Sequence, residues 1–364
     1  MRRSTVAAVA LMALLIFFAM FWKGIRHRKA VAPTSGTATI EFLDVGQGDA
    51  ALIRSPEGKT ALVDAGPSNR VVETLRDRGV KSLDLVVVSH HHIDHYGGMA
   101  AVVRAFRPRV FLDADSPHVT PAYVKLLEEI RKGGITAIRA GPKSRSISLG
   151  SVAITVLPMG PENPHEENNN SVGFRVQFGG FSALLTGDSE RAERRWWMQN
   201  CPNLCADVDV LKLAHHGSRN GTDATWLELT RPKLAVASLG LDNDFGHPHA
   251  ETLDLLRSFK IPLDRTDLSG SIEIRTDGRD WSVKGSPAPS RAPPGSASRP
   301  GIKPRKVDLN LATEDELRAI PGIGPALARR IMARRPYRSV EDLRSVPDFG
   351  EKRVDHLRPF ITVD

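Results

Sequence analysis

The run HHHIDHYGG at residues 90–98 is the part of the sequence with the clearest chemistry. It follows an apolar, β-branched run that predicts a buried strand. Four imidazoles and a carboxylate this close together are costly to fold unless a cation compensates them. His90 and His92 can lie on one side of the turn, which leaves Asp94 and His95 to reach a neighbouring position. The pattern therefore predicts two adjacent metal ions held by nitrogen and oxygen ligands.

Three more expected strands end in residues of the same kind. Asp188 follows one of them, His215 and His216 follow another, and Asp64 follows a third. A lone Asp or His at a strand end is usually a turn residue. Four such ends indicate one shared site, in which Asp188 could bridge two ions.

A pair of bridged ions ~3.5–4 Å apart activates water near neutral pH and neutralises the charge that develops on a phosphorus under attack. Such a site needs no serine or cysteine nucleophile, and we identify none. The sequence contains neither a P-loop nor the glycine pattern of a dinucleotide site. These observations favour metal-assisted hydrolysis.

The elements that must position these side chains alternate between β-rich and helical patterns. Ten runs predict strands: Thr39–Val45, Ala50–Arg54, Thr60–Val63, Leu85–Ser89, Val152–Leu157, Gly173–Phe178, Ser182–Thr186, Val208–Leu213, Leu234–Ser238 and Ser271–Arg275. Four runs predict helices: Val71–Arg78, Pro121–Lys132, Glu190–Gln199 and Ala250–Phe259. Several strands precede the first helix and the pattern then alternates, which indicates an α+β fold with helices packed outside sheets.

The 364 residues divide by composition into four parts. Residues 286–304 are rich in Pro, Ser and Gly and contain no acid, which is typical of a linker. They separate a body, residues 38–285, from a tail, residues 305–364. The body carries 32 acidic and 29 basic residues, whereas residues 1–37 carry six basic residues and no acid. The net charge of +8 therefore belongs to the two ends of the chain, and the body is mildly acidic.

Composition also excludes two classes of protein. Hydrophobic residues make up 41% of the chain, which is enough for a sizeable core and excludes a disordered protein. Two cysteines exclude a disulfide-rich scaffold and a Cys-rich zinc module. Cys201 and Cys205 could close a short disulfide in an oxidising compartment or remain reduced.

Residues 1–37 are expected to anchor the chain in a membrane. Val6–Trp22 is uncharged and almost wholly apolar, and its length is at the lower limit for crossing ~30 Å of hydrocarbon. A cleavable signal is the alternative, because AVA at residues 30–32 has the form of a cleavage site. The count of basic residues on each side favours a cytoplasmic body, whereas a disulfide between Cys201 and Cys205 would need an oxidising compartment, so the sequence leaves the orientation open. We expect the body and the tail to be extracytoplasmic.

The body resembles the metallo-β-lactamase fold, and more narrowly the hydrolase-like domain of ComEC-type competence proteins. The resemblance runs in order over residues 38–284. Besides the histidine run, it is carried by FLDVGQGDAALI (42–53), TALVDAG (60–66), NNNSVGF (168–174), LLTGDSE (184–190), KLAHHGS (212–218), GHPHAETL (246–253) and RTDLSGSIEIRTDG (265–278). It implies an αββα sandwich with a metal site at the sheet edges, and hydrolysis of phosphodiesters rather than β-lactams.

The resemblance also implies the ligands of two divalent ions, Zn²⁺ or Mn²⁺. His90 and His92 would hold the first ion. Asp94 and His95 would hold the second, and Asp188 would bridge the two.

Other matching residues would support these ligands. His216, or else His215, would complete the second ion's ligand set. Asp64 would orient a ligand from behind. His247 would contact the phosphate or the leaving group.

The chain departs from the family pattern at the first ion. Many relatives carry a third histidine where this chain has Asn168–Ser171, so Asn170, His165 or water would complete that position. Many ComEC-type domains also have Asp in place of His92. The residues expected to take part directly in catalysis are Asp94, Asp188, His247 and Asn170.

The tail contains two glycine turns that each open an expected helix, at residues 320–324 and 346–350. Free N–H groups at a helix start bind phosphate. Residues 306–363 resemble the paired helix-hairpin-helix DNA-binding domain of ComEA-type proteins, although Asp348-Phe349 replaces the usual Gly-Ile of the second turn. The DNA-binding residues that this implies are Gly322, Gly324, Arg329, Arg330, Gly350, Lys352 and Arg353.

Together these observations predict a membrane-anchored phosphodiesterase with two metal ions. It would be a nuclease whose tail holds DNA by its backbone, without sequence preference, in DNA uptake or processing beside other uptake components. Two alternatives are a DNA receptor whose hydrolase domain is a weakly active or inactive scaffold, and a hydrolase of another phosphodiester or ester.

Overall fold

The computed structural model of the chain describes two stretches of residues. The first is residues 36–284, except 115, 117–118, 162, 164–165 and 242. The second comprises residues 307–312, 317, 325–346, 354, 357–358 and 361–363. The expected anchor, apart from residues 36–37, and the expected linker lie outside these residues. No helix within them is long and apolar enough to cross a membrane.

The chain forms two compact units, residues 1–240 with 247–289 and residues 241–246 with 290–364. The larger unit contains two β-sheets. The first has eight strands in the order β15 (Trp281–Lys284), β14 (Ile272–Thr276), β1 (Ala38–Phe42), β2 (Ala51–Arg54), β3 (Thr60–Val63), β4 (Leu85–Val87), β5 (Val110–Asp113) and β6 (Thr136–Arg139). The second has seven in the order β13 (Leu263–Arg265), β12 (Leu234–Ala237), β11 (Val210–Lys212), β10 (Phe181–Leu185), β9 (Phe174–Phe178), β8 (Val152–Val156) and β7 (Arg145–Leu149).

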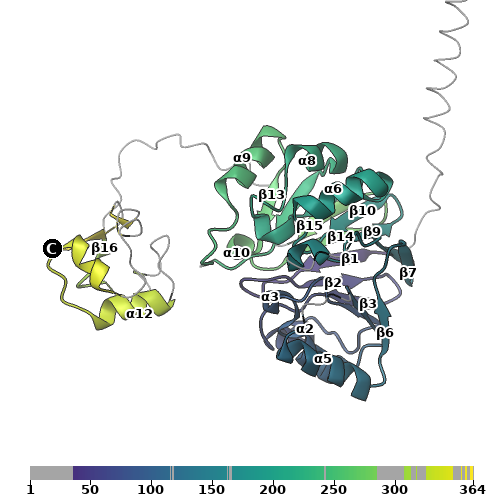
Figure 1. The fold of residues 1–364 in the computed structure, drawn as a ribbon, viewed down its shortest axis with the longest axis horizontal. Coiled ribbons are helices and arrows are strands. Elements are labelled where there is room, and N and C mark those ends of the chain that lie inside the picture. The colour runs from purple at the N-terminus through teal and green to yellow at the C-terminus, as the bar shows by residue number, and fades with distance from the viewer. Residues whose placement is uncertain are drawn as a thin grey trace, which may run out of the picture. The chain divides into compact units, whose positions relative to one another are not determined.

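Helices cover the outer face of each sheet (Figure 1). In the chain, four helices alternate with strands of the first sheet: α2 (Val71–Asp77), α3 (Ile93–Tyr96), α4 (Met99–Phe106) and α5 (Pro121–Lys132). The second sheet is accompanied by α6 (Arg191–Asn200), α7 (Pro202–Cys205), α8 (Ala224–Thr230), α9 (Ala250–Ser258) and α10 (Thr266–Ser269). Two short 3₁₀ helices, η1 (Glu167–Asn170) and η2 (Ala214–Gly217), lie at strand ends.

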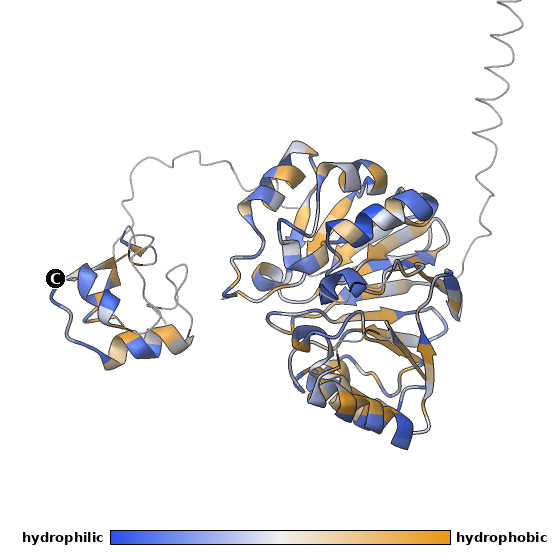
Figure 2. Ribbon diagram, in the orientation of Figure 1, coloured by the Kyte–Doolittle hydropathy of each residue, from blue (hydrophilic) through white to orange (hydrophobic). Residues whose placement is uncertain are grey.

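Three hydrophobic clusters hold these layers together. One contains residues of both sheets, such as Phe42 and Phe174, and fills the space between them. The second packs the first sheet against α2, α4 and α5, and the third packs the second sheet against α6, α8 and α9. Figure 2 shows hydrophobic residues concentrated in the strands between the helical layers. The predicted αββα sandwich is therefore confirmed.

Local sequence explains why several elements form where they do. β4 is buried at every position, as expected for a parallel strand covered on both faces. α5 begins after Thr120, whose hydroxyl accepts the N–H of Tyr123 at 3.1 Å, and Pro121 occupies its first turn.

Five strands and five α-helices of the larger unit were not predicted. They are β5, β6, β7, β13, β15, α3, α4, α7, α8 and α10. β6 and β7 each form one edge of a sheet and are mostly exposed; each contains only two apolar residues, too few to mark a half-buried strand. The two cysteines of the larger unit are free.

The smaller unit has its own core. Its described elements are α12 (Pro325–Ala333), η3 (Val340–Ser345) and a two-stranded sheet of β16 (Val307–Asp308) and β17 (Ile361–Thr362). β16 and β17 pair in parallel and so join the two ends of the tail. Buried apolar side chains from all parts of the tail, Ile331 and Leu343 among them, form one cluster. The tail can therefore fold around its own hydrophobic residues.

Gly97 and Gly98 allow the close backbone approach that the sequence suggests. A Cβ atom on Gly98 would overlap the carbonyl oxygens of Ala65 and Ser68, and one on Gly97 would overlap that of Pro67. The N–H of Gly98 donates to the carbonyl of Gly66 at 3.0 Å. The turn after Asp64 is thus held directly against the turn after His95.

Replacing Gly98 by alanine should lower the free energy of unfolding of the larger unit by about 1–3 kcal/mol, the usual range for overpacking. Urea unfolding followed by tryptophan fluorescence measures this, because every described tryptophan lies in the larger unit. Gly141→Ala is the matched control, since a Cβ there meets no atom within 4 Å. Equal stability of the two variants would contradict the packing argument.

Candidate metal centre

The predicted metal-binding side chains come from strand ends of both sheets. β3 leads to Asp64, and β4 leads into α3, which carries Asp94 and His95. In the other sheet β10 leads to Asp188, and β11 leads into η2 with His216. Parallel strands end at a common edge, so β3 and β4 place their residues side by side, and β10 and β11 do the same.

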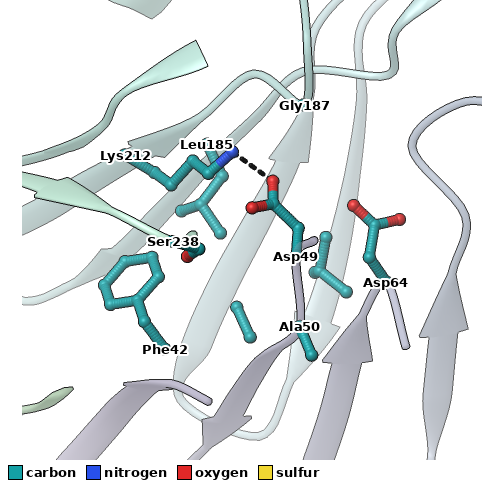
Figure 3. Close-up of a pocket in the computed structure, with 10 residues that line it drawn as sticks. Phe42, Asp49, Ala50, Asp64, Leu185, Gly187, Lys212 and Ser238 are labelled. Atoms are coloured by element: carbon teal, nitrogen blue, oxygen red, sulfur yellow. Dashed lines mark ion pairs between the residues drawn. The ribbon is translucent and has the colours of Figure 1, made fainter. Parts of the chain in front are cut away.

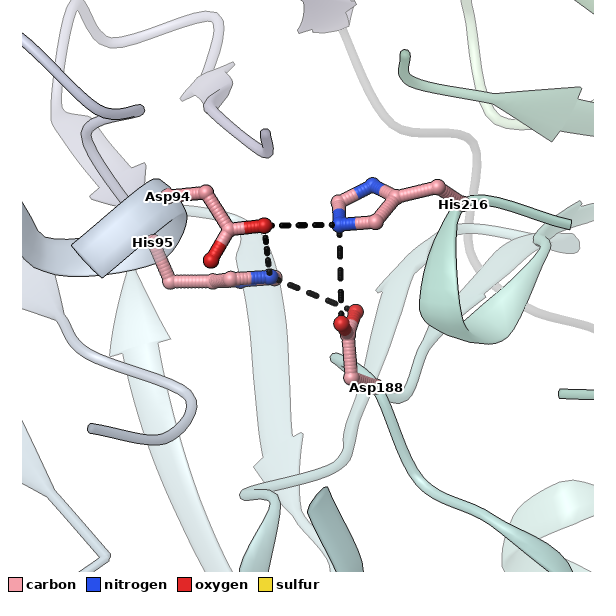
Figure 4. Close-up of side chains that lie close together, drawn as sticks. All are labelled: Asp94, His95, Asp188 and His216. Carbon is pink, nitrogen blue, oxygen red and sulfur yellow. Dashed lines mark hydrogen bonds and ion pairs between the residues drawn. The ribbon is translucent and has the colours of Figure 1, made fainter. Parts of the chain in front are cut away.

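Four of these side chains converge on one point (Figure 4). Asp94, His95, Asp188 and His216 each offer one ligand atom, and the four atoms lie within 4.8 Å of one another. Nε2 of His216 lies 3.2 Å from Oδ2 of Asp94 and 3.5 Å from Oδ2 of Asp188. Nε2 of His95 lies 3.3 Å from Oδ1 of Asp188. Two imidazoles and two carboxylates form a donor set that suits Zn²⁺ or Mn²⁺.

Two atoms of this group are left without a hydrogen bond. Nε2 of His95 and Oδ1 of Asp188 are buried and have no hydrogen-bond partner among the described residues. Buried polar atoms are normally satisfied. A cation between them would satisfy both, so these residues fit a metal ion.

The pKa values of the metal-free group also indicate that it attracts positive charge. Burial opposes a charge on His95, yet the carboxylates of Asp188 and Asp64 raise its pKa well above the ordinary value. For His216, burial is again outweighed by Asp188 and Asp49, which raise its pKa to about 10. The pKa of Asp188 is held well below its ordinary value, against burial, by His216 and His95. The group therefore takes up protons where it lacks a metal cation.

Asp64 lies behind His95, where it can orient the ring. Its Oδ2 is 2.9 Å from Nδ1 of His95, and its carboxylate accepts both the N–H and the hydroxyl of Ser89 at 2.7 and 2.8 Å. His216 is held in the same way, because its Nδ1 lies 2.8 Å from the carbonyl oxygen of Ser238. The Nε2 atom of each ring is thus left to face Asp188.

His90 and His92 lie next to this group. Nε2 of His90 is 3.1 Å from Nδ1 of His92 and 4.0 Å from Oδ2 of Asp188. Burial and the neighbouring His95 lower the pKa of His90 well below its ordinary value, so the ring is neutral, as a metal ligand must be. Among the described residues, neither histidine belongs to a set of three or more potential ligands as compact as the one around Asp188.

The Asn170 amide is engaged within its own loop. It accepts the N–H of Asn163 at 2.8 Å and donates to the carbonyl of Asn163 at 2.9 Å. This geometry supports a structural role in the loop more directly than a place in the first ion's ligand set. His165, the alternative ligand, lies outside the described residues.

The remaining predicted histidines line one side of the centre. Nε2 of His215 lies 3.9 Å from Oδ2 of Asp188, while its Nδ1 lies 3.1 Å from Glu190. The His247 ring is 5.4 Å from that of His215 and 6.1 Å from that of His216. Burial, together with His216 and His215, lowers the pKa of His247 to about 4. At neutral pH His247 is therefore an uncharged hydrogen-bonding group.

Sequence reasoning missed two charged residues of this region. Oδ1 of Asp49 lies 3.3 Å from Nδ1 of His216, and Asp49 also forms a compact potential metal-binding group with Asp64 and His95. Lys212 forms a buried ion pair with Asp49. Both stand inside quoted motifs, FLDVGQGDAALI and KLAHHGS. A lysine within an otherwise apolar strand was the available signal.

The DNA-binding residues predicted in the tail are only partly described. Arg329 and Arg330 lie exposed on α12. The others, Gly322, Gly324, Gly350, Lys352 and Arg353, lie outside the described residues.

The sandwich and its cluster of His and Asp define a metal-dependent hydrolase fold. Residues 43–240 match the metallo-beta-lactamase superfamily, and the chain belongs to this superfamily. The fold binds divalent metal ions, typically two. Residues 303–362 match the helix-hairpin-helix motif.

Three relatives with related sequences indicate a narrower group within the superfamily. ComE operon protein 3 of Bacillus subtilis is 28% identical over 265 residues, which are 67% of this chain and 34% of that protein. Recombination protein 2 of Haemophilus influenzae is 29% identical over 246 residues, 65% of this chain and 29% of that protein. ComE operon protein 1 of Bacillus subtilis is 37% identical over 73 residues, 19% of this chain and 36% of that protein.

The resemblance to ComEC-type competence proteins, with a helix-hairpin-helix motif added, is therefore confirmed. The chain spans about a third of the length of these relatives.

The metal-free protein should lose stability as the pH rises from about 7 to about 10. The pKa of His216 is ~6.5 in the unfolded chain and about 10 in the folded protein. Its stabilising contribution is therefore complete below pH ~6.5 and is lost as the pH rises through about 10. The midpoint of urea unfolding in the presence of a chelator, measured at several pH values, tests this. The midpoint of His216→Gln should decline less over the same range; equal declines would refute this assignment.

Proposed function

We propose that this protein is a two-metal phosphodiesterase, a nuclease that cuts DNA held by its helix-hairpin-helix tail. The observation that carries the proposal is the convergence of Asp94, His95, Asp188 and His216, two of whose buried atoms make no hydrogen bond within the described residues. Divalent ions bound there would activate water and neutralise charge on the scissile phosphate. The second ion would be held by these four residues, and the first by His90 and His92 with a share of Asp188.

The chain's own residues would prepare the centre for this chemistry. Asp64 orients His95, and the carbonyl of Ser238 orients His216, so both rings present Nε2 to the ion. His247 borders the centre as a neutral ring, because its pKa lies near about 4. We propose that it donates a hydrogen bond to a phosphate oxygen or to the leaving group.

Charge distribution supports a division of labour between the two units. The body has more acidic than basic residues, so its net negative charge does not attract DNA. The tail carries a surplus of basic residues, and Arg329 and Arg330 are exposed there. We propose that the tail holds the DNA backbone without sequence preference and that the body supplies cleavage.

The names of the relatives suggest the biological process in which this chain acts. Related proteins are called ComE operon proteins 3 and 1, Recombination protein 2 and Competence protein ComA, the last from Neisseria gonorrhoeae. We propose that this chain acts in DNA uptake, anchored to a membrane through residues 1–37 with its body and tail outside the cytoplasm.

A DNA receptor with an inactive hydrolase domain is the second candidate. It is favoured by the first ion's position, where, among the residues that the structure describes, Asp188 is shared with the second ion and the amide of Asn170 is engaged elsewhere. Such a receptor would bind DNA without cutting it.

Asp188→Ala should abolish cleavage without affecting DNA binding. The rate of cutting of single- and double-stranded DNA should fall by about a hundredfold or more, because even residues that only orient metal ligands contribute about 10–100-fold. Gel assays of cleavage, with metal content measured in parallel, test this. Metal-loaded wild-type protein that binds DNA and never cuts it would refute the nuclease and favour the receptor.

Deleting residues 302–364 should weaken DNA binding and leave cleavage of bis(p-nitrophenyl) phosphate unchanged. The deletion should also reduce the salt dependence of DNA binding, because fewer phosphates are contacted. Filter binding at several salt concentrations and a colorimetric assay measure the two activities. Arg329→Ala with Arg330→Ala is a milder variant that should act in the same direction. Loss of small-substrate cleavage on deletion would contradict the division of labour.

A further inference from the structure

Lys212 is a buried lysine directly behind the proposed metal centre. It ends β11 of the second sheet, and only 3% of its surface is exposed. Its side chain reaches across to Asp49, which stands just before β2 of the first sheet (Figure 3). Lysine is almost never fully buried unless it is paired.

The space around the ammonium group has room for at most about one water molecule. Lys212 and Asp49 line a cavity of about 10 Å³ together with apolar side chains such as Phe42, Val63 and Leu185. That volume is about the least that holds a single water. The charge of Lys212 must therefore be compensated by protein groups.

The compensating groups are carboxylates that contact the proposed ligands. Nζ of Lys212 pairs with Oδ2 of Asp49 and lies 4.0 Å from Oδ1 of Asp188. Asp49 in turn lies 3.3 Å from Nδ1 of His216 and 3.9 Å from Nδ1 of His95. Lys212 thus touches one proposed ligand directly and two more through Asp49.

Charge explains why a cation is needed at this place. Asp49, Asp64 and Asp188 are buried, and each lies within a few ångströms of His95. Like charges this close repel, and burial strengthens the repulsion. Although burial disfavours its charge, Asp49 and Asp188 raise the pKa of Lys212, so the ammonium persists.

We propose that Lys212 and Asp49 are positioning residues of the metal centre: the ammonium of Lys212 holds Asp188 and Asp49 in place, and the charge of Asp49 reinforces the orientation that Ser238 and Asp64 give to the rings of His216 and His95. The pair would preform the ligand geometry before the metal arrives. It would also keep Asp49 engaged, so that Asp49 does not compete with the four ligands for the ion. This inference rests on the metal centre of the proposed function.

Cobalt binding to the full chain tests the proposal. Co²⁺ suits the same donors, and its visible absorption reports ligand geometry. Asp49→Asn keeps the shape of the side chain and removes its charge. We expect it to weaken Co²⁺ binding about 10–100-fold, the usual effect of residues that orient ligands, and to change the Co²⁺ absorption spectrum. Lys212→Met should do the same.

A double variant and a matched control complete the experiment. Lys212→Met leaves Asp49 buried and unpaired, so combining it with Asp49→Asn should cost less than the sum of the two single changes. Lys233→Met is the control. Lys233 pairs with Asp209 at 2.7 Å just before β12 and β11, the strands whose far ends reach the centre, and its side chain is exposed. It should bind Co²⁺ like the wild type.

The outcomes separate this inference from the proposed function. A folded Asp49→Asn protein, as judged by circular dichroism, with wild-type Co²⁺ affinity and spectrum would overturn the inference. Independent, additive effects of the two changes would also overturn it. A wild-type protein that binds Co²⁺ and cuts no DNA would refute the nuclease and leave the positioning roles intact.

Discussion

The structure depends on the burial of several carboxylates where the two sheets meet. Asp49, Asp64 and Asp188 lie beneath the surface, each close to His95. Such a group is stable only if positive charge is brought to it. Lys212 supplies one charge, protons on His95 and His216 supply more in the metal-free protein, and divalent metal would replace those protons.

The sandwich architecture brings the ligands from both sheets together at this buried site. Each sheet alone offers only part of the ligand set: α3 follows the first sheet with Asp94 and His95, and the second contributes Asp188 and His216. The core between the sheets fixes their separation, and the contact of Gly97 and Gly98 with the turn after Asp64 fixes the local approach. Residues more than 100 positions apart in the chain thereby meet within a few ångströms.

Most features that depend on neighbouring residues in the sequence were predicted, whereas several that depend on distant contacts were not. The strands that precede Asp64, His90, Asp188 and His215 were predicted because each is a short run rich in apolar residues, and the αββα architecture followed from the family resemblance. The exposed edge strands β6 and β7 were missed because edge positions allow polar residues. Asn170 was predicted as a possible ligand from its place in a motif, yet its amide is taken up by Asn163, a contact that no pattern reveals.

The sequence by itself determined the superfamily and the residue types available for metal binding, because these depend on motifs and composition. Only the tertiary structure decided which ligand atoms converge and that Asp49 and Lys212 form a charged pair behind them. The reason is physical. A strand's pattern reports which faces are buried, whereas a pair drawn from two sheets depends on how those sheets pack, and that is decided by the core as a whole.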